Sequence, residues 1–323
     1  MRTVFAVLLL VSTAVTPQLP HDDAIRIAEF YRLASQVQNS VWTDWGKTAG
    51  PLLLVTENAE FLTHYSTPPE DFAKAAEDVY ARPRKFDTNL LATFPAFSSL
   101  AVIVIGEPQN TAAKTSTPWL ITVMHEHFHQ LQDGQPGYYD AVERLGLSGG
   151  DNSGMWMLNY PFPYDKAEVG QKFSQLRDLL VRALNMTDQK EFKKAAATYV
   201  RKRKKVFGAF SAADHKYISF QLWQEGLARY TQIKVAEAAA SYQPTAEYAA
   251  LSDYEPFSAY ALRARTETLD ELKQADLAKW KRTFFYSFGG AEGLFLDRYD
   301  PGWKKRYFAH LLSTDELFDR RRD

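Results

Sequence analysis

The chain has 323 residues, of which 46% are hydrophobic and 24% are charged, a composition typical of globular proteins and not of disordered chains. Its formal net charge is −1, so no overall electrostatic field favours binding to nucleic acid or to an anionic membrane. It contains no cysteine, which excludes disulfides, thiolate metal ligands and a cysteine nucleophile. Any metal ion must therefore be held by histidine, aspartate or glutamate.

The first residues have the pattern of a secretory signal peptide. Arg2 precedes an unbroken apolar run at residues 4–11, and the small residues Ser-Thr-Ala follow at 12–14. The apolar run is shorter than the roughly 20 residues that span a bilayer. We therefore expect residues 1–14 to be removed on export to the periplasm or the medium, and we expect no stable membrane span in the rest of the chain. The alternative interpretation is a hydrophobic helix docked in the core.

Residue periodicity predicts one helix, then a few strands, then an almost entirely helical remainder. No Gly/Ser-rich linker and no internal repeat divides the chain. We therefore expect a single α+β domain over residues 15–323, with a small N-terminal β-sheet and a predominantly helical C-terminal half. The predicted helices are 22–41, 118–133, 165–184, 189–207, 215–240, 258–279, 284–299 and 303–312, and the predicted strands are 51–56, 88–94 and 98–108.

Five consecutive basic residues occupy positions 201–205 in the predicted helix 189–207. Such a run is one signature of nucleic-acid binding. Because the flanking residues are amphipathic, we interpret it as the solvated face of a helix and expect no nucleic-acid partner.

Three of the seven histidines lie within five residues, in the string His125-Glu126-His127-Phe128-His129. Most of the surrounding helix is apolar, which predicts that it is buried. Residues four apart on an α-helix differ by about 40° in direction and about 6 Å in height, so His125 and His129 leave the same face. Two imidazoles placed in this way can bind one metal ion, and Glu126 can reach a water molecule on that metal. His127 is expected to face away. Hydrogen-bonded core histidines are the alternative.

This string resembles the H-E-x-x-H motif of the zinc metallopeptidases called zincins. The metzincin subclass would continue with a further histidine, whereas residues 130–134 here read Gln-Leu-Gln-Asp-Gly. The resemblance is therefore to the gluzincins, which take their third zinc ligand from a glutamate on a later helix. It covers about the middle third of the chain. The Gly-Ala-Met-Glu-Asn signature of the large aminopeptidases is absent, so the resemblance does not imply that activity.

Glu225 is the candidate for the third ligand. It lies near the middle of the predicted helix 215–240 among large apolar residues, a poor place for a solvated carboxylate. The string from Gln224 to Ala228 resembles the Glu-Gly-x-Ala pattern around the metal-binding glutamate of several gluzincins. Gly226 indicates a close approach by another helix, for which the histidine helix is the natural neighbour. Arg229, one turn later, is expected to pair with the Glu225 carboxylate. A surface glutamate paired with Arg229 is the alternative.

Two further residues have weaker claims to the site. Tyr286 precedes a stretch with almost no side chains, Gly289 to Gly293, and can donate a hydrogen bond to an oxyanion, although packing explains a tyrosine there equally well. Asp133, four residues after His129, is an alternative ligand or hydrogen-bond acceptor, but its place beside Gly134 favours a solvated helix end.

These residues together predict an exported zinc hydrolase of gluzincin type, acting on a peptide or protein substrate. His125, His129 and Glu225 would bind Zn²⁺, and a water would occupy the fourth position. Glu126 would take the proton of that water and pass it to the leaving amine. The strand at residues 100–105 is expected to pair with extended substrate, as in the enzymes that this chain resembles. The alternatives are a non-catalytic exported binding or scaffold protein with a zincin-like fold, and a zinc hydrolase of a non-peptide bond.

Overall fold

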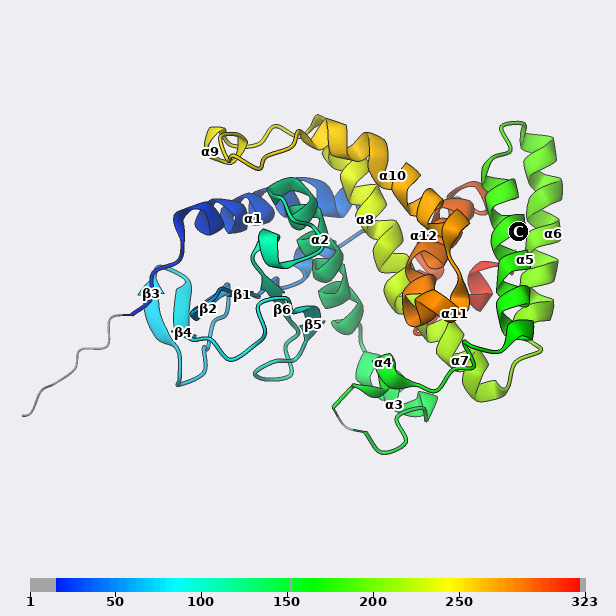
Figure 1. Ribbon diagram of the computed structural model, residues 1–323, viewed down its shortest axis with the longest axis horizontal. Helices are drawn as coiled ribbons and strands as arrows, with labels where there is room; N and C mark the ends of the chain where they lie inside the picture. The colour runs from blue at the N-terminus through cyan, green and yellow to red at the C-terminus, as the bar shows by residue number, and fades with distance from the viewer. Residues whose placement is uncertain (1–15, 152, 320–323) are drawn as a thin grey trace, which may run out of the picture.

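The computed structural model describes residues 16–151 and 153–319, and Figure 1 shows their arrangement. The predicted signal segment, residues 1–14, lies outside the described residues. Within the described residues, one helix and a mixed sheet come first and a mainly helical half follows, so the predicted α+β class is confirmed.

Six strands form one sheet in the order β3-β4-β2-β1-β6-β5. Strands β1 and β6 run parallel, and every other neighbouring pair is antiparallel. The strands are β1 (Leu52–Val55), β2 (Ala59–Thr63), β3 (Ala73–Ala76), β4 (Val79–Pro83), β5 (Leu91–Phe94) and β6 (Val102–Gly106).

The helices largely follow the predicted ranges, with the longest ones within three residues at their starts. The last predicted helix, 303–312, shrinks to one short turn, and the predicted helix 258–279 is divided in two. The α-helices of the described residues are α1 (His21–Val41), α2 (Ser116–Asp133), α3 (Tyr138–Leu145), α4 (Trp156–Asn159), α5 (Ala167–Leu184), α6 (Gln189–Phe207), α7 (Ala212–Gln221), α8 (Leu227–Ala238), α9 (Ala246–Ala249), α10 (Phe257–Gln274), α11 (Leu277–Trp280), α12 (Phe284–Tyr299) and α13 (Lys304–Tyr307).

The central strands of the sheet are buried on both faces. Successive side chains of a strand point to opposite faces, and each face packs into its own core. Leu54 and Ile105 belong to the main core, which they share with α1 and α2. Leu53 and Val104 belong to a smaller core on the opposite face, closed by aromatic side chains from the connecting loops. Strands β1 and β6 therefore have the continuous apolar character that the sequence shows at residues 100–105.

The strand expected to bind substrate is an inner strand. β6 is hydrogen-bonded to β1 on one side and to β5 on the other, so its backbone groups have no room for a peptide. The prediction for residues 100–105 is wrong in this respect. The edge of the sheet nearest α2 is β5 instead.

Helix α8 connects the two halves of the molecule. It packs against α2 and α1 on one side and against α12 and α10 on the other (Figure 1). Helices α7 and α8 are joined without a break by a π-helical turn, η3 (Leu222–Gly226), in which the Leu227 N–H donates to the Leu222 carbonyl. Within residues 16–151 and 153–319, no helix has the length and apolarity needed to cross a membrane.

The basic run of α6 is only partly a solvated face. Arg203 is 3% exposed, and its Nε donates a 2.6 Å hydrogen bond to Glu292 of α12. Its Nη1 donates to Asp315 at 2.7 Å. One member of the run therefore ties α6 to α12 and to the C-terminal segment, while Lys204 and Lys205 are exposed.

Candidate metal centre

Helix α2 brings His125, Glu126 and His129 together in a buried position. Each is 5–6% exposed, and the centroids of the two imidazole rings lie 4.9 Å apart. One nitrogen of each histidine and one carboxylate oxygen of Glu126 all lie within 4.8 Å of one another. This group can hold a metal ion, as the spacing of the histidines predicts.

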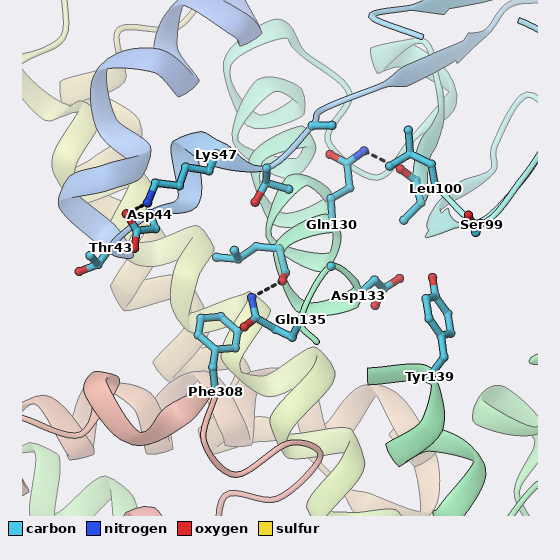
Figure 2. A pocket seen from close by; sticks show the side chains of 15 residues that line it. Thr43, Asp44, Lys47, Ser99, Leu100, Gln130, Asp133, Gln135, Tyr139 and Phe308 are labelled. Carbon is cyan, nitrogen blue, oxygen red and sulfur yellow. Dashed lines mark hydrogen bonds and ion pairs between the residues drawn. The ribbon is translucent and has the colours of Figure 1, made fainter. Parts of the chain in front are cut away.

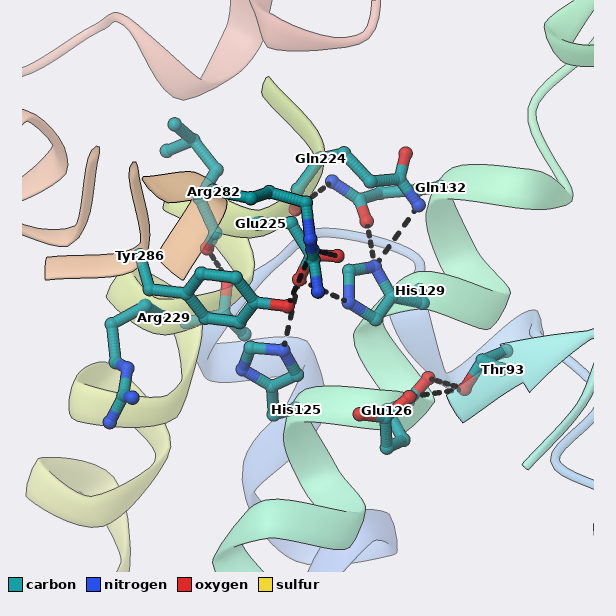
Figure 3. Close-up of polar contacts among 12 residues, drawn as sticks. Thr93, His125, Glu126, His129, Gln132, Gln224, Glu225, Arg229, Arg282 and Tyr286 are labelled. Atoms are coloured by element: carbon teal, nitrogen blue, oxygen red, sulfur yellow. Dashed lines mark hydrogen bonds and ion pairs between the residues drawn. The ribbon is translucent and has the colours of Figure 1, made fainter. Parts of the chain in front are cut away.

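Glu225 faces the two histidines from the π-helical turn η3. Its Oε2 lies 3.4 Å from His129 Nε2 and 3.8 Å from His125 Nε2 (Figure 3). A π-helical turn holds one residue more than an α-helical turn, and such turns occur frequently at functional sites. Here the turn contains Glu225 itself. Two imidazole nitrogens therefore share one facing carboxylate oxygen, a donor set that fits a zinc ion.

Electrostatics couple the three groups. Burial favours the neutral form of both imidazoles, and it lowers the pKa of His125. At His129 the hydrogen bond and charge of Glu225 outweigh burial and raise the pKa to about 9. Burial alone would raise the pKa of Glu225, but hydrogen bonds from His125 and His129 and the charges around it hold that pKa well below its usual range. The carboxylate is thus ionised and facing a proton on His129, the position that a metal ion would take over.

Gln132 orients His129. The Gln132 Nε2 donates to the Trp223 carbonyl at 2.9 Å, so its Oε1 must be the atom that lies 2.6 Å from His129 Nδ1. Oε1 is an acceptor, hence Nδ1 carries a hydrogen and the lone pair of the neutral ring is on Nε2. Gln224 Nε2 lies 3.2 Å from the same Nδ1, but it is a donor as well, so it forms no hydrogen bond with an Nδ1 that carries a hydrogen. The nitrogen left for a metal ion is the one facing Glu225.

Arg282, and not Arg229, binds the Glu225 carboxylate. Arg282 Nη1 donates to Glu225 Oε1 at 3.0 Å and lies 3.0 Å from the Tyr286 hydroxyl. The prediction for Arg229 is wrong, because its side chain turns away toward Glu271, 3.9 Å distant. Arg282 is 57 residues from Glu225 in sequence, and the prediction missed it; its position one turn before Tyr286 was the available signal.

Tyr286 lies over His125, with the two rings parallel to within 2° and their centroids 6.1 Å apart. Figure 3 shows its hydroxyl directed toward Glu225. Burial, reinforced by the charge of Glu225, raises the pKa of Tyr286 well above its usual value. The phenol therefore keeps its hydrogen and can donate it.

A residue of the sheet holds Glu126 in position. The Thr93 hydroxyl, in edge strand β5, lies 2.8 Å from Glu126 Oε2 and 3.0 Å from the Glu126 carbonyl oxygen. His127 faces the other way, as the helical spacing predicts: its ring lies 2.8 Å from Gln130 Oε1 and 3.0 Å from Gln38 Oε1. Glu126 and His127 thus have different surroundings although they are adjacent.

The glycine at 226 permits a close helix contact, but with α12 and not with the histidine helix. A Cβ added to Gly226 would lie 2.7 Å from the Cα of Gly289. This contact brings Tyr286, which is less than one turn from Gly289, beside Glu225. The neighbour named from the sequence is therefore wrong, while the close approach itself is present.

Two cavities flank this group. One, of about 480 Å³, is lined by His125, Glu126 and Tyr286 and gives access to the site from solvent. The other, of about 520 Å³, lies at the C-terminal end of α2 and includes Asp133 but neither His125 nor His129 (Figure 2).

Asp133 is not a solvated helix end. Its Oδ1 is buried and has no hydrogen-bond partner among the described residues, and burial raises its pKa to about 6. It nevertheless lies outside the His125–Glu126–His129 group.

Comparison of the chain with family models, with curated proteins and with solved structures finds no match. The candidate metal centre is therefore inferred from the geometry of these residues alone.

Proposed function

We propose that this protein is a zinc-dependent hydrolase of peptides or proteins, with His125, His129 and Glu225 as the zinc ligands. The observation that carries the proposal is the position of Glu225 Oε2, 3.4 Å and 3.8 Å from the two Nε2 atoms. Two histidines and a carboxylate form one of the ligand sets of catalytic zinc sites, which keep a fourth position for water. The 480 Å³ cavity beside His125 supplies the space for that water and for substrate.

Each of the other residues of the site has its own role in the proposed hydrolysis. When bound, zinc lowers the pKa of its water and polarises the scissile carbonyl. Glu126 accepts the proton of the attacking water and delivers it to the leaving amine. The Thr93 hydroxyl holds the Glu126 carboxylate in place. Tyr286, which keeps its phenolic hydrogen, donates a hydrogen bond to the oxygen on which negative charge develops. Arg282 holds Glu225.

A peptide substrate is supported by the edge strand β5. An extended peptide can add to an exposed sheet edge through main-chain hydrogen bonds. Because Thr93 of β5 contacts Glu126, a peptide paired with β5 would pass directly beside the proposed general base. This role replaces the one that the sequence suggested for residues 100–105.

The proposal is tested by metal content and turnover in one pair of variants. The purified protein is expected to hold about one zinc per chain. Glu126→Gln should retain that zinc and lower the cleavage of a peptide library by about 10²-fold or more, because it loses proton transfer only. His127→Gln, the matched change one residue away, should retain both zinc and activity. Loss of zinc in Glu126→Gln would mean that Glu126 is a ligand.

The same measurements separate the alternatives. Zinc without cleavage of any peptide would favour a binding protein or a hydrolase of another bond, and a protein that takes up no zinc would remove the hydrolase proposal.

We also propose export through residues 1–14, on the sequence pattern alone. Mass spectrometry of the protein from its natural source should find a chain that begins near residue 15, whereas an intact Met1 would contradict export.

A further inference from the structure

One wall of the 480 Å³ cavity is formed by Arg229. This residue lies on α8, one turn after Glu225, and the cavity that it lines also contains His125 and Glu126. Figure 3 shows Arg229 leaving the same helical segment as Glu225, on the His125 side of the site. A group bound by Arg229 would therefore lie within the same cavity as the proposed reaction.

Arg229 has few partners. Its Nε is buried and has no hydrogen-bond partner among the described residues. Its ion pair with Glu271 spans 3.9 Å, which is beyond hydrogen-bond distance. The side chain as a whole is 27% exposed, so its remaining donors face the cavity and solvent. Guanidinium donors without hydrogen-bond partners in the protein are available to a ligand in the cavity.

A second arginine of the same cavity provides a comparison. Arg263 forms hydrogen bonds to the carboxylates of Glu255 and Glu267. Its positive charge is thus balanced within the protein, and Glu267, although it also lines the cavity, is engaged by it. Of these two arginines, Arg229 is the one that has no carboxylate within hydrogen-bond distance among the described residues.

Helix α12 positions the Arg229 side chain. A Cβ added to Gly290 would lie 2.9 Å from Arg229 Cγ and 3.5 Å from Arg229 Cβ. The stem of the arginine therefore lies directly over a glycine, in space that any other residue would fill. This packing fixes the direction in which the guanidinium leaves α8.

We propose that Arg229 binds a carboxylate of the substrate. The guanidinium presents a planar fork of N–H donors that matches a carboxylate and can bind it with two parallel hydrogen bonds. On a peptide, that carboxylate is either the C-terminal group or an Asp or Glu side chain near the cleaved bond. The inference rests on the proposed function and names its substrate class: peptides with a negative charge within reach of this cavity.

The test measures binding and cleavage separately. The Glu126→Gln protein, which should not turn over substrate, is titrated calorimetrically with acetyl-trialanine and with its C-terminal amide. Amidated acetyl-Ala-Glu-Ala and acetyl-Ala-Gln-Ala form a second pair. One pair distinguishes a C-terminal carboxylate and the other a side-chain carboxylate. We expect the charged member of one pair to bind about 30-fold more tightly, in line with a charge-assisted pair in a partly exposed site.

Variants assign that preference to Arg229. Arg229→Gln should abolish the preference, Arg229→Lys should keep part of it, and Arg263→Gln, which removes the same charge from the same cavity, should keep all of it. Thermal melts of the variants confirm that each is folded. An unchanged preference in Arg229→Gln, or no preference in the parent protein, would overturn the inference.

The cleavage measurement separates this inference from the proposed function. Peptide cleavage without a carboxylate preference would overturn only the role of Arg229. A carboxylate preference in binding that Arg229→Gln removes, in a protein that cleaves no peptide, would support the role of Arg229 and contradict the peptidase.

Discussion

Replacement of Gly226 by alanine should destabilise the protein, although glycine is a poor helix former. The new Cβ would lie 2.7 Å from Gly289 Cα and 3.2 Å from the Phe285 carbonyl oxygen. Carbon atoms in contact prefer about 3.5–4.0 Å, so η3 and α12 must separate locally by roughly 1 Å. Both obstructing atoms belong to a backbone, which cannot rotate aside as a side chain can.

The size of the effect follows from two opposing contributions. Overpacking of this kind is unfavourable by about 1–3 kcal/mol. The change from glycine to alanine in a helix is favourable by about 1 kcal/mol. Because the contacts are with backbone, we take the upper end of the first range and expect a net loss of about 2 kcal/mol in the free energy of unfolding. Separation of the helices should also move Arg282 and Tyr286 away from Glu225 and weaken zinc binding.

Gly170 provides the control. It lies within helix α5, and a Cβ added there meets no atom within 4 Å. Gly170→Ala should therefore raise the free energy of unfolding by about 1 kcal/mol, leaving a difference of about 3 kcal/mol between the two variants. Urea denaturation measures both, and a zinc competition titration measures the metal. If both variants gained stability equally, the reasoning about the contact between η3 and α12 would be refuted.

Two further predictions concern stability. His127 has a pKa of about 4 because it is buried, so between pH 6.5 and pH 4 the unfolded chain binds a proton that the folded chain does not. Stability therefore decreases as the pH is lowered through this window. His127→Gln should reduce the loss of stability between pH 7 and pH 5 by about 2 kcal/mol in urea denaturation, and an equal loss in both proteins would contradict the burial argument. Arg203→Met leaves the Glu292 carboxylate, 1% exposed, without its charged partner, and should lower stability by about 3–5 kcal/mol. The control Lys194→Met removes an exposed ion pair and should lower it by less than about 1 kcal/mol; similar losses in the two variants would show that burial does not decide the effect.

Much of the fold follows from local sequence patterns. Helices α5, α6 and α12 end where the periodicity predicts, because their apolar faces and terminal residues are adjacent in sequence. Strands β2, β3 and β4 are not predicted from the sequence. β3 is mostly exposed and β4 only partly buried, so neither shows a clear apolar pattern, and Glu60 interrupts the apolar residues of β2. The inner position of β6 depends on its parallel pairing with β1, about 50 residues earlier, which no local pattern reveals.

In the candidate site too, features set by local spacing could be predicted and contacts between distant elements could not. The geometry of His125 and His129 is fixed by their separation of four residues on one helix, so their shared face could be predicted. The location of Glu225 opposite them could be proposed because a carboxylate among large apolar residues needs a partner. Its contact with Arg282 could not be predicted, since that contact depends on how α12 crosses η3 at Gly226 and Gly289. Arg229 is nearer than Arg282 to Glu225 in the sequence, but in the structure Arg282 binds the Glu225 carboxylate and Arg229 faces Glu271.

The most direct test of the proposed metal centre is the position of zinc in crystals of the protein, located by anomalous diffraction at the zinc absorption edge. We predict one peak between the imidazoles, with Nε2 of His125 and of His129 and one oxygen of Glu225 each within about 2.2 Å. Glu126 should lie beside the metal without binding it, still in contact with Thr93. Zinc held by Glu126 or Asp133 in place of Glu225, or no zinc between the two histidines, would contradict the account.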